Sequence, residues 1–148
     1  MKKIVSVLAT VGLAAGLLVA SGGPASASPP CTTFGYAVAA SGNILAVPAT
    51  NGGASPFHCH LQRGYSNRAV WYLQYSITWC YRDYREDVLN IAVDGNYGPK
   101  TQAAVRRVQE IEHIKVDGTY GPQTRNAMMH RQAEWEEQDP NVCRKLGW

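Results

Sequence analysis

The sequence has little excess charge of either sign and, after its first 20 residues, no long apolar run. Its 148 residues include 14 basic and 11 acidic side chains. A protein that binds nucleic acid normally shows a basic stripe, and none is visible here. A membrane-spanning helix needs roughly eighteen apolar residues in succession. We therefore expect no nucleic-acid partner and, once the N-terminal apolar run has been removed, no membrane segment.

Motifs for nucleophilic or acid–base catalysis are also missing. The sequence has no Gly-x-Ser-x-Gly motif, which would mark a nucleophile. Glu110 and Glu112 lie two residues apart, and side chains at that spacing on a helix point in different directions. The run that contains Glu134, Glu136 and Glu137 is typical of a solvated surface. We predict no catalytic residue.

The histidines form at most a weak metal pattern. His58 and His60 flank Cys59, with His113 and His130 further along the chain. Zinc sites usually add a third ligand at a regular spacing, and a cysteine in a disulfide cannot bind metal as a thiolate. We predict no metal and no cofactor.

The N-terminus has the pattern of a secretory signal peptide. Lys2 and Lys3 precede an apolar stretch over 4–20, and Ala25 and Ala27 supply the small side chains that signal peptidase requires. We place cleavage after Ala27, which makes residues 1–27 the signal peptide. Without Lys2 and Lys3, 12 basic and 11 acidic residues remain, a net charge of +1. The protein is expected to be secreted, and electrostatic attraction alone cannot drive its binding.

The four cysteines all follow the predicted cleavage site. Export takes them to an oxidising compartment, so two disulfides are expected, with three possible pairings. We favour the nested pairing, Cys59 with Cys80 and Cys31 with Cys143, because it staples the first helix and ties the ends of the domain together. The chain around Cys59 must then run back along the whole of that helix, which is a borderline reach.

Residues 28–58 are rich in Pro, Gly and Ser and predict a β-hairpin. Two short apolar runs, 34–40 and 44–49, are separated by Ser41-Gly42-Asn43. Pro48 cannot donate a backbone hydrogen bond, so the second run is expected at an edge. A lone hairpin is only marginally stable, so this one should pack against the following domain.

A helix is predicted from Ser66, which can cap it, to about Tyr81. Val70, Leu73 and Ile77 recur at helical spacing and form its core stripe. A second stripe of this helix is aromatic. This stripe either supports the hairpin or presents a platform for a ligand, because an exposed apolar patch of that size needs a partner. Its members are Trp71, Tyr75 and Trp79.

The segments 91–104 and 114–127 repeat one another at a shift of 23 residues. Each copy has an Asp-Gly pair, in which glycine can take a positive φ and the carboxylate can accept backbone amides. Each then has a Gly-Pro pair that suits the first turn of a helix. The predicted turn residues are Asp94, Gly95, Gly98, Asp117, Gly118 and Gly121. The predicted inner faces of the two helices are Ala104, Val105, Val108 and Ile111, and then Ala127, Met128 and Met129.

The predicted fold is mainly α. It is a small three-helix bundle with a duplicated turn-helix unit over 59–133, preceded by the hairpin segment and followed by a C-terminal tail over 134–148.

The repeat also carries a resemblance to a known family. The residues Leu61, Gly64, Val70 and Leu73-Gln74, followed by two Asp-Gly-x-Tyr-Gly-Pro-x-Thr turns, resemble the three-helix peptidoglycan-binding domain attached to bacterial cell-wall hydrolases. The resemblance covers about 60–132. Asn67 stands where the family often has glycine, and no hydrolase domain accompanies the module.

The resemblance implies non-covalent binding to the glycan or the stem peptide of peptidoglycan. We therefore expect a secreted, non-catalytic, monomeric protein that is extracellular or associated with the cell wall. The alternatives are a small cell-wall hydrolase or the targeting subunit of one, and a secreted protein that binds another protein or a peptide.

Candidate ligand-binding residues lie in the turns and on the aromatic stripe. Tyr97 and Tyr120 occupy the same place in both turns and serve either the core or the ligand. Asn96 and Thr119 are the positions at which the two turns differ. The aromatic candidates are Trp71, Tyr75 and Trp79. Candidate partners for stem-peptide carboxylates are Arg106, Arg107 and Arg125.

Overall fold

The computed structural model describes residues 28–133 and 143–148. The predicted signal peptide and residues 134–142 of the predicted tail, with their three glutamates, lie outside the described residues. No helix within the described ranges is long and apolar enough to cross a membrane. The elements in chain order are β1 (Thr33–Val38), β2 (Ile44–Ala49), α1 (Arg68–Cys80), the 3-10 turns η1 (Arg82–Tyr84) and η2 (Asp87–Leu89), α2 (Pro99–Ile111), α3 (Pro122–Ala127), β3 (His130–Arg131) and β4 (Cys143–Arg144).

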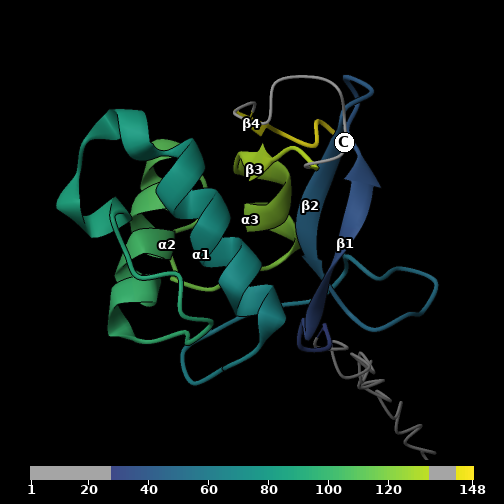
Figure 1. Cartoon of the computed structure of the whole chain (residues 1–148), viewed down its shortest axis with the longest axis horizontal. Helices are drawn as coiled ribbons and strands as arrows, with labels where there is room; N and C mark the ends of the chain where they lie inside the picture. The colour runs from purple at the N-terminus through teal and green to yellow at the C-terminus, as the bar shows by residue number, and fades with distance from the viewer. Residues whose placement is uncertain (1–27, 134–142) are drawn as a thin grey trace, which may run out of the picture.

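Helix α1 is the central element of the fold. It contacts α2 on one side and the β1–β2 hairpin on the other, and it also contacts β3 (Figure 1). Its stripe of Val70, Leu73 and Ile77 is fully buried, as the spacing predicts. Because three neighbours pack on α1, most of its circumference is covered, and a free surface remains mainly near its N-terminus.

The cap of α1 corrects the sequence prediction by one residue. Asn67, rather than Ser66, is the N-cap, and its Oδ1 accepts a hydrogen bond from the backbone nitrogen of Val70 at 3.1 Å. Its Nδ2 donates to the carbonyl of Cys31 at 3.0 Å. Ser66 instead donates from its hydroxyl to Asn96 Oδ1 at 2.6 Å. The two side chains therefore tie the start of α1 to the N-terminal segment and to the first turn.

The predicted hairpin is present and has a small core of its own. β1 and β2 pair antiparallel, with Phe34 opposite Pro48. Leu146, close to the C-terminus, is fully buried in this core, and its carbonyl accepts a hydrogen bond from the backbone nitrogen of Ala40 at 2.8 Å. The described end of the predicted tail is therefore part of the hairpin's packing. The buried residues of this core are Ala37, Ala39, Leu45, Val47 and Leu146.

The main core lies between the three helices. The three predicted helices exist, but α3 has only six residues, and the hairpin and the connecting segments make up much of the fold. The description as a mainly α bundle is therefore met only in part. Of the predicted inner-face residues, Ile111, Ala127 and Met129 are only partly buried. Those that are buried in the core are Ala104, Val105, Val108 and Met128.

The two disulfides correct the predicted pairing. Cys31 is bonded to Cys59, and Cys80 to Cys143. The strand-like segment at Cys31 runs beside that at Cys59, with the nitrogen of Cys31 donating to the carbonyl of His60 at 2.9 Å. Cys80, in contrast, ends a helix of 13 residues, roughly 20 Å long, which begins near Asn67 and Cys31. The helix length therefore keeps Cys80 away from Cys59.

Candidate functional site

The two Asp-Gly turns adopt the same local structure. Asp94 Oδ1 accepts from the backbone nitrogen of Asn96 at 2.8 Å, and Asp117 Oδ1 accepts from that of Thr119 at 2.9 Å. Gly95 and Gly118 have φ values of 78° and 72°, a region that glycine enters without steric cost. Gly98 and Gly121 are the N-caps of α2 and α3, and each is followed by proline at the start of the helix.

A buried glutamine from the preceding helix holds the first turn in place. The side-chain amide of Gln74 on α1 donates to Asp94 Oδ1 at 2.9 Å and to the carbonyl of Asn96 at 2.9 Å. It also lies 3.0 Å from the hydroxyl of Thr101. Its carbonyl oxygen accepts from the nitrogen of Gly95 at 2.8 Å. Because Gln74 is only 1% exposed, these bonds are shielded from water and fix the turn against α1.

Gln109 on α2 makes the equivalent contacts with the second turn. Its amide nitrogen is 3.0 Å from both Asp117 Oδ1 and the Thr119 carbonyl oxygen, and its oxygen accepts from the nitrogen of Gly118 at 2.8 Å. The repeating unit is therefore a helix followed by the turn that its glutamine holds. Helix α2 follows the first turn and holds the second.

The two helices that hold the turns also repeat in sequence, but at a different shift from the turns. Ala69-Val70 and Leu73-Gln74 recur as Ala104-Val105 and Val108-Gln109 at a shift of 35 residues. The turns repeat at a shift of 23 because the chain takes 20 residues from Gln74 to Asp94 but only 8 from Gln109 to Asp117. The extra residues of the first unit form η1 and η2.

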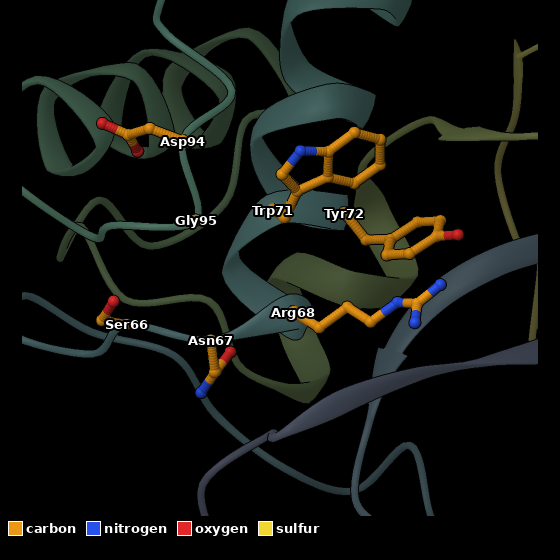
Figure 2. Close-up of a pocket in the computed structure, with 7 residues that line it drawn as sticks. All are labelled: Ser66, Asn67, Arg68, Trp71, Tyr72, Asp94 and Gly95. Carbon is orange, nitrogen blue, oxygen red and sulfur yellow. The ribbon is translucent and has the colours of Figure 1, made fainter.

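An open groove of about 460 Å³ lies where the first turn meets the start of α1. Figure 2 shows the rings of Trp71 and Tyr72 projecting from α1, with Asp94 and Gly95 on the adjoining loop. Trp71 is 37% exposed, so part of its surface is accessible to a ligand. The groove thus combines an accessible aromatic ring with polar side chains. Its lining residues are Ser66, Asn67, Arg68, Trp71, Tyr72, Asp94 and Gly95.

The two charged residues of the groove differ in their surroundings. The hydrogen bonds from the nitrogen of Asn96 and from Gln74 hold the pKa of Asp94 below its ordinary value, so its carboxylate is ionised at neutral pH. The guanidinium of Arg68 lies 4.9 Å from the ring centre of Phe34 and 6.0 Å from that of Tyr72. Arg68 is therefore packed toward the hairpin, whereas Asp94 belongs to the turn.

The aromatic stripe of α1 is covered in part: Tyr75 and Trp79 lie against Arg131, whereas Trp71 is exposed. The guanidinium of Arg131 on β3 lies 4.6 Å from the ring centre of Tyr75 and 4.7 Å from that of Trp79. The hairpin packs on the neighbouring Tyr72, whose ring stacks on Phe34 with centres 3.7 Å apart. Among the three rings of the predicted platform, Trp71 is the one at the open end.

The two turn tyrosines belong to the core, which is one of the two roles that the sequence left open. Tyr97 is 2% exposed and Tyr120 is fully buried. The hydroxyl of Tyr97 donates to the carbonyl of Gly118 at 3.0 Å, so it links the first turn to the second. Burial raises the pKa of both hydroxyls above the usual range. Ligand contact by these rings would require the core to open.

The remaining candidate ligand-binding residues differ in exposure and in the contacts that they make within the protein. Asn96 is exposed beside the groove, and Thr119 is half-buried on the second turn. Arg107 is bound by Glu86 through two contacts of 2.6 Å. Arg125 is 8% exposed and donates to the carbonyl of Phe57. Arg107 and Arg125 are thus engaged within the protein.

The histidines do not converge. Cys59 is in a disulfide, His60 Nε2 lies 2.8 Å from the hydroxyl of Tyr65, and His130 is buried. Within 28–133 and 143–148, no group of three or more His, Cys, Asp or Glu side chains is placed to hold a metal ion.

The repeated segment is similar to a known protein family. Residues 77–128 match a family model described as a putative peptidoglycan binding domain. The match runs from the last turn of α1 to the residue after α3 and includes both Asp-Gly turns. The resemblance seen in the sequence is therefore confirmed for this segment, which is similar to that family over about a third of the chain. Neither the curated proteins nor the solved structures gave a match.

Proposed function

We propose that this protein is secreted and binds peptidoglycan without cleaving it. The observation that carries the proposal is the groove in which the first turn of the matched segment, at Asp94 and Gly95, meets the exposed ring of Trp71. Aromatic rings beside polar side chains suit a ligand that has both apolar faces and hydrogen-bonding groups. The two disulfides agree with a location outside the cytoplasm.

The chemistry of the groove favours binding over hydrolysis. A glycosidase generally needs two carboxyl groups that flank the bond to be cut. Asp94 is the single carboxylate among the described residues that line the groove. Its hydrogen bonds with Gln74 and Asn96 build the turn and lower its pKa, whereas a general acid needs a raised pKa.

Sedimentation with insoluble peptidoglycan tests the proposal. The secreted form, with its disulfides intact, is mixed with purified peptidoglycan at low salt and centrifuged. We expect the protein in the pellet, and its release only on denaturation or by competing soluble fragments. Recovery of all of the protein in the supernatant contradicts the proposal.

A peptidoglycan gel assay separates the binding protein from a small hydrolase. We expect no cleared band at the position of this chain. A cleared band contradicts the non-catalytic role and supports the enzyme. A targeting subunit would also leave the gel intact, but purification from the secreting cell would then yield a complex with a hydrolase.

A further inference from the structure

The two turns differ in what lies over their glycines. The equivalence of Gln74 and Gln109 places Asn67 opposite Gln102 and Trp71 opposite Arg106. A Cβ atom on Gly118 would lie 2.8 Å from Arg106 Nε and 2.9 Å from Gln102 Cγ. On Gly95, the nearest side-chain atom would be Cβ of Trp71, at 3.9 Å.

Both glycines are buried, but two side chains cover Gly118, whereas the nearest atom to a Cβ on Gly95 is the backbone oxygen of Asn67, at 3.2 Å. The Nε and Cγ atoms of Arg106 and the Cγ atom of Gln102 all lie within 3.1 Å of a Cβ built on Gly118. At the first turn, the ring of Trp71 points away from Gly95 and becomes one wall of the groove (Figure 2). Two units with the same backbone thus present different surfaces.

The charges of the groove indicate which part of peptidoglycan it accepts. Among the described residues that line it, Arg68 and Asp94 are the charged ones, and their formal charges cancel. Figure 2 shows Arg68 extending away from Asp94 toward the hairpin, where it packs on Phe34. The open part of the groove then has an ionised carboxylate and an aromatic ring. Stem peptides carry carboxylates, which Asp94 repels, whereas an N-acetylated glycan is largely uncharged and offers N–H and O–H donors.

We propose that the first turn unit alone forms the ligand site and that it binds the glycan strand rather than the stem peptide. This inference rests on the proposed function. The ring of Trp71 stacks on the apolar face of a sugar ring, and the Asp94 carboxylate accepts a hydrogen bond from a hydroxyl or acetamido group. The second unit, closed by Arg106, has a structural role.

The test compares matched variants of the equivalent positions 71 and 106. Wild type, Trp71→Ala, Trp71→Phe and Arg106→Ala are titrated against intact peptidoglycan and against glycan strands from which the stem peptides have been removed enzymatically. Both side chains are exposed, and circular dichroism verifies that each variant is folded. Free stem peptide is added as a competitor in a separate series.

We expect wild type and Arg106→Ala to bind both polymers, with weaker binding to the peptide-free glycan at low salt only, because hydrolysis of the amide leaves a carboxylate on the sugar and salt screens its repulsion by Asp94. Free stem peptide should not compete. Trp71→Ala should weaken binding about tenfold or more, because a central aromatic contact typically dominates such a site. Trp71→Phe should lose less, since a smaller ring remains.

Three outcomes overturn the inference, and they are distinguishable. Binding to intact peptidoglycan but not to peptide-free glycan assigns the ligand to the stem peptide and leaves the proposed function standing. Equal effects of Trp71→Ala and Arg106→Ala show that the first unit alone is not the site. No binding to intact peptidoglycan by wild type removes the proposed function and the inference with it.

Discussion

The side-chain nitrogen of Gln109 lies 3.0 Å from the carboxylate oxygen of Asp117, eight positions further along the chain. The same amide group lies within hydrogen-bonding distance of Thr119 and Thr124, and its oxygen accepts from the backbone nitrogen atoms of Asp117 and Gly118. One buried side chain therefore organises the second turn, as Gln74 organises the first.

Replacing this glutamine should be costly. Gln109→Ala leaves the buried nitrogen of Gly118 without its partner, and we expect the free energy of unfolding to fall by about 3 kcal/mol. Urea unfolding followed by circular dichroism measures the change. Gln123→Ala, at an exposed position of α3, is the control and should change stability by less than about 0.5 kcal/mol. A similarly small effect of Gln109→Ala would show that the turn forms without its glutamine.

Gly95 and Gly98 give a matched pair within one turn. Gly95→Ala places a Cβ at φ 78° and 3.2 Å from the carbonyl oxygen of Asn67, a backbone atom that cannot move aside. We expect a loss of about 1–2 kcal/mol. Gly98 has φ −88° and no atom within 4 Å of a built Cβ, so Gly98→Ala should stay within about 0.5 kcal/mol of wild type. Equal losses in thermal unfolding would contradict this account.

The buried His130 should make stability depend on pH. Burial lowers its pKa from 6.5 to about 4, although its hydrogen bond with the carbonyl of Arg125 acts in the opposite direction. The unfolded chain takes up the proton below pH 6.5, and the folded protein only near pH 4. The neutral, buried His130 therefore contributes fully to the stability of the fold above pH 6.5, and this contribution is lost as the pH falls toward 4. Across this pH range the free energy of unfolding should fall by about 3 kcal/mol in total, with a slope of up to about 1.4 kcal/mol per pH unit.

Two variants isolate this contribution. Urea unfolding at several pH values between 6.5 and 4 should show a flatter dependence for His130→Gln than for wild type, because glutamine does not titrate. His58 is exposed, so His58→Gln should keep the wild-type slope. If His130→Gln has the wild-type slope as well, another group is responsible.

The disulfide pairing can be read directly by peptide mapping without reduction. We expect linked peptides for Cys31–Cys59 and Cys80–Cys143. The second bond spans 63 residues, and its removal in Cys80→Ser/Cys143→Ser should cost about 4 kcal/mol through the entropy of the unfolded chain. A peptide that links Cys59 to Cys80 would instead support the nested pairing.

The features that the sequence predicted well are local ones. A hairpin over two apolar runs, and turns with positive φ at Gly95 and Gly118, follow from preferences that act within a few residues. The capping of α1 was misplaced by a single residue because Ser66 and Asn67 are both good caps. The choice depends on a distant residue, Asn96, which accepts the hydroxyl of Ser66 and so leaves the cap to Asn67.

The features that it missed depend on contacts between distant segments. For Tyr97 the sequence left a core role and a ligand role open, and the choice depends on the second turn, where the carbonyl of Gly118 accepts the hydroxyl of Tyr97. The openness of the first turn likewise depends on which side chain of the preceding helix lies over it, Trp71 or Arg106. Aligning the two helices at a shift of 35 residues pairs Trp71 with Arg106. Aligning the two turns at a shift of 23 residues does not pair them.

The bond between Cys80 and Cys143 has a consequence for proteolysis. It closes a covalent ring that contains both turns, α2 and α3. A single cut anywhere between the two cysteines opens the ring without releasing a fragment, so a nicked chain keeps the mass of the whole protein plus one water until it is reduced.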